Sequence, residues 1–137
     1  MTDQTATALV REAMPLAATL GLRAERYTPE AVVLALDWSP ELCTSNGLLH
    51  GGAIMALADS AGGACAFLNL PEDASGTSTI ESKTNFVGGV RNGAATATAT
   101  VLHRGRTTIV IETSVRDGSD VLVAKVTQTQ IVLRARN

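Results

Sequence analysis

The stretch that decides the fold is His50–Leu70, with the sequence HGGAIMALADSAGGACAFLNL. Between Gly51 and Leu70, apolar residues recur with the three- and four-residue spacing of one helical face, which predicts a helix over this range. The face that we expect to pack on a sheet consists of Ile54, Leu57, Ala58, Ala61, Cys65 and Leu68. The run is just long enough to cross a membrane, but a carboxylate at Asp59 would be costly in hydrocarbon. We therefore predict a buried core helix and no membrane association.

Asp59 lies away from this sheet-facing stripe. Its neighbours three and four positions away are Met55, Ala56, Gly62 and Gly63, so the face that carries the acid is also apolar and small. A helix that is apolar all round is a buried helix, so we expect a second subunit or a bound ligand to cover this face. A buried acid is a functional candidate. The structural alternative is a solvated acid, or one hydrogen-bonded to a neighbouring strand.

The segments before the long helix predict a helical arm and a β-hairpin. Residues 5–20 are rich in helix formers, and Pro15 is expected to end or kink that helix. Residues 22–27 and 31–38 are short β-compatible runs. The tripeptide Thr28-Pro29-Glu30 between them is typical of a turn, so we expect the two runs to pair as a hairpin.

The segment after the long helix predicts strands. Residues 95–100 alternate Ala and Thr, as a strand with one buried face does. Glycine-containing turns at residues 103–106 and 117–120 separate β-branched runs. Together with the run that begins at Thr77, these signals predict a meander of about four consecutive strands. The expected class is α+β, with a long helix packed on an antiparallel sheet.

Composition and charge narrow the class of protein. With 137 residues, 45% of them apolar, the chain is expected to form one domain over residues 1–137, with residues 1–20 as an N-terminal helical arm. A net charge of -2 without a polybasic run argues against nucleic acid as a partner. Because the two cysteines lack CxxC spacing and the start is not signal-like, we expect a cytoplasmic protein without a zinc site.

The start of the long helix has the sequence Asn46-Gly47-Leu48-Leu49-His50-Gly51-Gly52. Two glycines at a helix N-terminus present backbone N–H groups that no side chain shields, at the positive end of the helix dipole. Such groups can bind a carbonyl oxygen or an oxyanion. The structural alternative is ordinary capping, with His50 as a hydrogen-bond partner and glycine chosen for close packing.

The spacing of Gly51 and Asp59 bears on assembly. They are eight residues apart, which corresponds to about 12 Å along a helix. One chain therefore cannot bring both groups to one carbonyl. If they cooperate, Gly51 of one subunit must meet Asp59 of another, and antiparallel packing of two such helices across a two-fold axis would create two equivalent sites.

The chain resembles the hotdog-fold acyl-CoA thioesterases of the phenylacetate-pathway (PaaI-like) type. The matching residues are Leu20-Gly21-Leu22, Asn46–Ala53, Leu57-Ala58-Asp59, Thr84-Asn85-Phe86 and His103–Thr107. The resemblance implies a long central helix wrapped by a curved antiparallel sheet of about five to six strands. It also implies a homodimer that pairs again as a dimer of dimers.

The same resemblance implies roles for individual residues. The polarising N–H falls on Gly51, the catalytic carboxylate on Asp59 and the histidine that orients the thioester on His50. Thr79 matches the polar residue that positions the attacking water. Relatives often carry a polar Asn or Gln six positions before the histidine. In this chain that position is Thr44, and an asparagine, Asn46, stands four positions before the histidine. Either of these two residues could replace the polar group of the relatives, or neither. The substrate-binding residues that we expect are Thr44, Asn46, Gly52, Gly63, Arg91, Arg104 and Arg106, where the arginines suit the phosphates of CoA.

The activity implied is hydrolysis of an aryl or medium-chain acyl-CoA to a free acid and CoA, with Asp59 as general base or nucleophile. This chemistry requires no metal and no organic cofactor. One alternative is an acyl-thioester hydratase or dehydratase on the same scaffold. Another is a non-catalytic acyl-CoA-binding protein, in which Asp59 would be structural.

Overall fold

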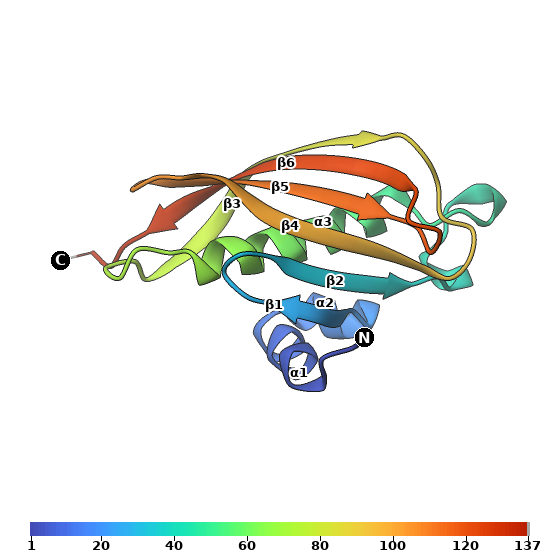
Figure 1. Ribbon diagram of the computed structural model, residues 1–137, viewed down its shortest axis with the longest axis horizontal. Helices are drawn as coiled ribbons and strands as arrows, with labels where there is room; N and C mark the ends of the chain where they lie inside the picture. Colours follow the sequence, from blue (N-terminus) through green and yellow to red (C-terminus); the bar gives the residue numbers. More distant parts are fainter. Residues whose placement is uncertain (137) are drawn as a thin grey trace.

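The computed structural model describes residues 1–136 and shows one long helix packed against one side of a curved sheet (Figure 1). The elements follow in the order α1 (Gln4–Ala13), α2 (Pro15–Leu20), β1 (Arg23–Tyr27), β2 (Val32–Asp37), η1 (Pro40–Leu42), η2 (Ser45–Gly47), α3 (Gly51–Leu68), β3 (Gly76–Phe86), β4 (Ala94–Arg104), β5 (Thr108–Arg116) and β6 (Leu122–Leu133). The hotdog arrangement of a long helix wrapped by an antiparallel sheet, expected from the sequence, is confirmed.

The six strands form one antiparallel sheet in the order β1-β2-β4-β5-β6-β3. The predicted β1–β2 hairpin and the turns on either side of β5 are confirmed. The predicted four-strand meander is wrong in one respect, because β3 pairs with β6 at the far edge and not with β4. One edge of β4 is taken by β2 and the other by β5, so none is left for β3. Alternation identifies a strand and its buried face, but it does not identify the neighbouring strand.

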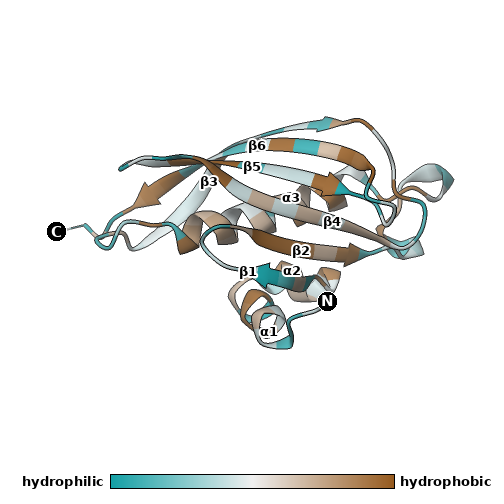
Figure 2. Cartoon of the chain, viewed as in Figure 1, coloured by the Kyte–Doolittle hydropathy of each residue, from teal (hydrophilic) through white to brown (hydrophobic). Residues whose placement is uncertain are grey.

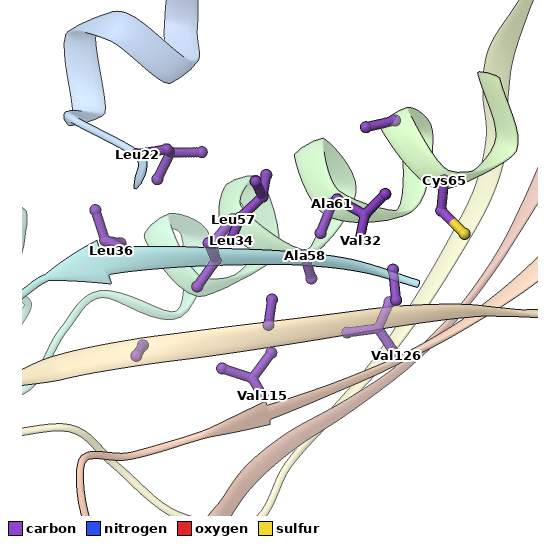
Figure 3. Close-up of a cluster of buried hydrophobic side chains, with 14 of the residues drawn as sticks. Leu22, Val32, Leu34, Leu36, Leu57, Ala58, Ala61, Cys65, Val115 and Val126 are labelled. Carbon is purple, nitrogen blue, oxygen red and sulfur yellow. The ribbon is translucent and has the colours of Figure 1, made fainter. Parts of the chain in front are cut away.

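The helix α3 packs its predicted stripe into the sheet. Leu57, Ala58 and Ala61 are fully buried and lie among side chains of β2, β5 and β6, including Val115 and Val126 (Figure 3). Burying a leucine side chain such as Leu57 contributes about 1.5–3 kcal/mol. The stripe therefore fixes α3 to the sheet, and the sheet does not cover the opposite face of α3.

The helix ends at Leu68, two residues before the predicted end at Leu70. The buried side chain of Asn69 explains this end. Its Nδ2 donates to the carbonyl of Cys65 and to the carbonyl of Pro29, both at 2.8 Å. The amide thus satisfies a carbonyl in the last turn and ties the end of α3 to the β1–β2 turn.

The predicted N-terminal helix is divided into α1 and α2 at Pro15, as its sequence indicates. Met14 has extended backbone angles, which the residue before a proline prefers. Asp3 caps α1 by accepting from the Ala6 N–H at 3.0 Å. The Thr7 hydroxyl accepts from the Ala24 N–H of β1 at 2.9 Å, so the arm is attached to the sheet.

Hydropathy follows burial in this fold. Figure 2 shows β2 as an almost continuous hydrophobic strand, and four of its six residues are buried. Among the described residues, α3 is the one helix with the length and hydropathy of a membrane span, and 50% of it is buried inside the fold. Such burial is typical of the core helix of a globular protein.

Candidate active site

The start of α3 leaves one backbone donor free. The Nδ1 atom of His50 accepts from the Gly52 N–H at 2.8 Å, and the His50 carbonyl accepts from the N–H groups of Ala53 and Ile54. Within residues 1–136, no group accepts from the Gly51 N–H. His50 therefore caps the helix, which the sequence had left as one of two possibilities. Its side chain accepts the hydrogen bond of the Gly52 N–H, so that N–H is not available to a ligand. Of the two glycines, Gly51 has the N–H that can bind a ligand.

The end of β3 lies close to this helix start. A Cβ atom on Gly51 would be 3.2 Å from Cζ of Phe86, whose side chain is half exposed. Glycine at this position allows the ring of Phe86 to approach the first turn of α3. The free N–H is consequently placed beside an aromatic side chain at the surface.

Asp59 lies on the face of α3 that the sheet does not cover. It is exposed in the single chain, as are Met55 and Phe67 on the same helix. Its Oδ1 atom accepts from Thr79 Oγ1 at 2.7 Å and from Gln128 Nε2 at 3.0 Å. No group among residues 1–136 donates to Oδ2. One oxygen of the carboxylate is thus held while the other is available, and the predicted cover over this face stays a prediction.

Thr79 is brought to Asp59 by the pairing of β3 with β6. It stands opposite Gln130, whose Nε2 donates to Thr79 Oγ1 at 2.5 Å. The threonine hydroxyl donates to Asp59 and accepts from Gln130, so in this structure it holds the carboxylate. A bulge in β3 directly after Thr79 leaves Ile80 without a partner on β6, and bulges of this kind aim the neighbouring side chains.

Gln128 and Gln130 are the two site residues that the sequence reasoning missed. Both are buried, and they alternate with outward residues between Val126 and Val132 on β6. Two amides at inward positions of a strand are unusual, because a buried amide is costly without hydrogen-bond partners. The pair of glutamines at inward positions of a strand is therefore the sequence signal that could have identified these two site residues.

A cavity of about 440 Å³ opens beside Asp59. Its residues come from α1, β1, α3, β3, β6 and the residue between α1 and α2, and they are Val10, Ala13, Met14, Tyr27, Asp59, Gly63, Ala64, Phe67, Gly76, Thr77, Ser78, Thr79 and Gln130. The predicted pocket residue Gly63 is among them. Gly62, the other glycine of the pair, is instead buried under β6. Burial raises the pKa of the Tyr27 phenol.

The remaining predicted substrate-binding residues do not form one cluster. Arg91 donates from Nη1 to the carbonyl of Asn46 at 2.9 Å, so these two lie together in the loops near the start of α3. Thr44, in the same loop, is exposed. Arg104 and Arg106 lie at the other end of β4, at the tip of the β4–β5 hairpin (Figure 1). A single chain therefore does not gather the three arginines into one phosphate site.

Gly51 and Asp59 are both confirmed to lie on α3. At 1.5 Å per residue they are separated by about 12 Å. The free N–H and the free carboxylate oxygen cannot contact the same atom within one chain. Residues 1–136 contain no group of three or more His, Cys, Asp or Glu side chains placed to hold a metal ion.

Comparison with known proteins gives consistent results. Residues 46–124 match the model of the thioesterase superfamily. The Pseudomonas aeruginosa protein named "Putative esterase PA1618" is 33% identical over 119 residues, which cover 85% of this chain and 82% of that protein. The crystal structure of a mutant of thioesterase PA1618 superposes with a TM-score of 0.87 at 26% identity, covering 97% of this chain and 95% of that one. A thioesterase family protein from Silicibacter pomeroyi gives a TM-score of 0.85 at 28% identity, covering 94% and 96%.

Proposed function

The chain belongs to the thioesterase superfamily, and from this membership we propose that it hydrolyses an acyl-CoA thioester to a free acid and CoA. The observation that carries the proposal is the carboxylate of Asp59. Its Oδ1 is held by two donors, while the carboxylate borders a largely apolar cavity. This arrangement suits a group that must act on water or on a carbonyl carbon next to an apolar acyl chain.

We propose a homodimer as the active form. Five apolar side chains are exposed on α3, on β3 and at the residue after β3, and they are Met55, Phe67, Ile80, Phe86 and Val87. A large exposed apolar surface next to an unpaired edge strand is typical of an interface. Antiparallel packing of two α3 helices would bring Gly51 of one subunit to Asp59 of the other. Pairing of two such dimers into a tetramer is part of the same proposal.

In the proposed reaction, the thioester carbonyl oxygen accepts from the Gly51 N–H at the positive end of α3. Asp59 of the other subunit then follows one of two routes. As a general base it takes a proton from water, which attacks the carbonyl carbon; as a nucleophile it forms a mixed anhydride that water cleaves. Either route consumes one water and releases the acid and the CoA thiol.

The cavity beside Asp59 is the proposed acyl site. Its volume of about 440 Å³ and its apolar lining suit an aryl or medium-chain acyl group. Arg91, beside Asn46 near the start of α3, is a proposed contact for the phosphates of CoA. The positions of Arg104 and Arg106 require a second subunit if they are to share that role.

The proposal is tested by measuring thiol release from phenylacetyl-, hydroxybenzoyl-, short-, medium- and long-chain acyl-CoA. We expect hydrolysis of at least one ester by the wild-type protein and none above background by Asp59→Ala. Glu30→Gln, which changes an exposed acid in the β1–β2 turn, is the matched control and should behave as wild type. Binding of acyl-CoA without hydrolysis of any ester would contradict the proposal and support the non-catalytic binding function.

Gly63→Val is expected to shift the preference toward shorter acyl groups. No atom lies within 4 Å of a Cβ at this position, so the new side chain would project into the cavity. One methylene more or less in an apolar pocket changes kcat/KM by about 10- to 200-fold, and valine adds three carbons. We expect a loss of at least this order for octanoyl- and phenylacetyl-CoA and a much smaller one for acetyl-CoA.

The control for this experiment is Gly118→Val in the β5–β6 turn, where a Cβ also meets open space. Its preference among acyl groups should match that of the wild-type protein. An equal loss for all chain lengths in Gly63→Val would contradict the placement of the acyl group in this cavity.

A further inference from the structure

Two buried amides converge on the carboxylate from the sheet side. The side chains of Gln128 and Gln130 are 0% and 1% exposed. Gln128 Nε2 donates to Asp59 Oδ1 at 3.0 Å, and Gln130 Nε2 donates to Thr79 Oγ1, which in turn donates to the same Oδ1 at 2.7 Å. Gln130 is itself held by Thr77, whose hydroxyl donates to its Oε1 at 3.0 Å. All these bonds orient one carboxylate oxygen.

The fold makes room for Gln128 in particular. Its amide lies against the backbone of α3 at Gly62, where a Cβ would overlap the amide. Its Oε1 atom is buried and has no partner among the described residues. An unpaired buried acceptor lowers stability, so an apolar side chain would fill this position at a smaller cost. The amide is therefore poorly explained as core packing.

We propose that Gln128 and Gln130 are positioning residues for Asp59; this inference rests on the proposed function. Gln128 acts directly on Oδ1, and Gln130 acts through Thr79. Because both side chains are enclosed by the core, they have little rotational freedom and hold the carboxylate with Oδ2 free to react. An amide donates these hydrogen bonds without adding a charge next to the reacting group.

The test uses Gln128→Met and Gln130→Met, which keep the length of the unbranched side chain and remove the amide. We expect kcat to fall about 100-fold in Gln128→Met, because misplacement of a reacting group by about 1 Å has an effect of this size. A smaller fall is expected in Gln130→Met. In Gln128→Met, KM should change little, because Gln128 does not line the proposed acyl cavity, and the melting temperature should not fall, because the unpaired Oε1 is removed. The kcat and KM values are measured with the preferred acyl-CoA of the panel, and the melting temperature is measured by thermal unfolding.

The matched control is Thr113→Val. Thr113 is also buried on a neighbouring strand, with a hydroxyl that has no partner among the described residues, and it takes no part in the site. Its kcat should equal that of the wild-type protein, which separates loss of a buried polar group in general from loss of the donor to Asp59.

A double-mutant cycle completes the test. Because the amides act through the carboxylate, Gln128→Met should cause no further loss of the residual activity of Asp59→Asn. Wild-type kcat in Gln128→Met, or an equal further loss in the Asp59→Asn background, would overturn the inference. If Gln128→Met does not fold, Gln130→Met carries the same comparison. Full activity of Asp59→Ala would instead contradict the proposed function.

Discussion

Asp59→Asn is expected to lower kcat for thioester hydrolysis by about 10²–10⁴-fold, the range that a general base contributes. The asparagine Oδ1 can accept the same hydrogen bonds that Asp59 accepts from Thr79 and Gln128, so the geometry of the site should persist. What the substitution removes is the negative charge and the basic or nucleophilic Oδ2. The loss should therefore fall on kcat, with the melting temperature close to that of the wild-type protein.

The measurement is steady-state kinetics on the preferred acyl-CoA, with thermal unfolding as the check on folding. A single turnover of the wild-type protein in H₂¹⁸O tests the anhydride route. Label found in the Asp59 carboxylate would indicate an anhydride that water cleaves at the Asp59 carbon, whereas label confined to the released acid is the result of direct attack by water or of anhydride cleavage at the acyl carbon. Wild-type kcat in a folded Asp59→Asn variant would rule out both routes.

Gly51→Pro is expected to lower kcat by about 10²–10³-fold, as removal of one oxyanion-hole donor does. Proline lacks the backbone N–H but is well tolerated at the first position of a helix. His50, the residue before it, already has extended angles (φ -60, ψ 135) that a following proline favours. No acceptor within residues 1–136 uses the Gly51 N–H, so the fold should lose no hydrogen bond.

The control is Gly51→Ala. It keeps the N–H and adds a Cβ that meets the ring of Phe86 at 3.2 Å, as the proline would. Gly51→Ala should retain substantially more activity than Gly51→Pro. Equal kcat values for the two variants would show that contact with Phe86, and not the missing donor, causes the loss.

The same variants test whether two subunits share each site. In a heterodimer of a Gly51→Pro chain and an Asp59→Ala chain, one site receives both substitutions and the other receives neither. Co-expression with two purification tags should therefore recover activity from two inactive parents. If each chain held a complete site, the heterodimer would be as inactive as its parents.

Much of the fold could be predicted from local patterns. The stripe containing Leu57 and Ala61, the break at Pro15 and the β1–β2 hairpin depend on residues close together in the chain, and the structure confirms them. The neighbour of β3 was predicted wrongly, because alternation in β3 is compatible with several partners. The choice depends on how β2 and β4 pair over α3, which involves residues far apart in sequence.

The residues of the candidate site also fall into those that the sequence predicted and those that it did not. Gly51 and Asp59 were identified from the sequence as a donor and an acid on one helix. Gln128 and Gln130 were not, because they belong to a β-branched run whose alternation indicates only a strand. Their relation to Asp59 requires the register of β3 on β6 and the packing of α3 over β6.

The sequence by itself determined the long helix, the pair of glycines at its start and the acid at Asp59, because helix periodicity is a property of consecutive residues. Only the tertiary structure decided which donors hold the acid. Thr79 and Gln130 are 51 residues apart in the chain and meet through strand pairing. Such pairing is selected by the burial of a whole sheet face around α3, which no local stretch of sequence contains.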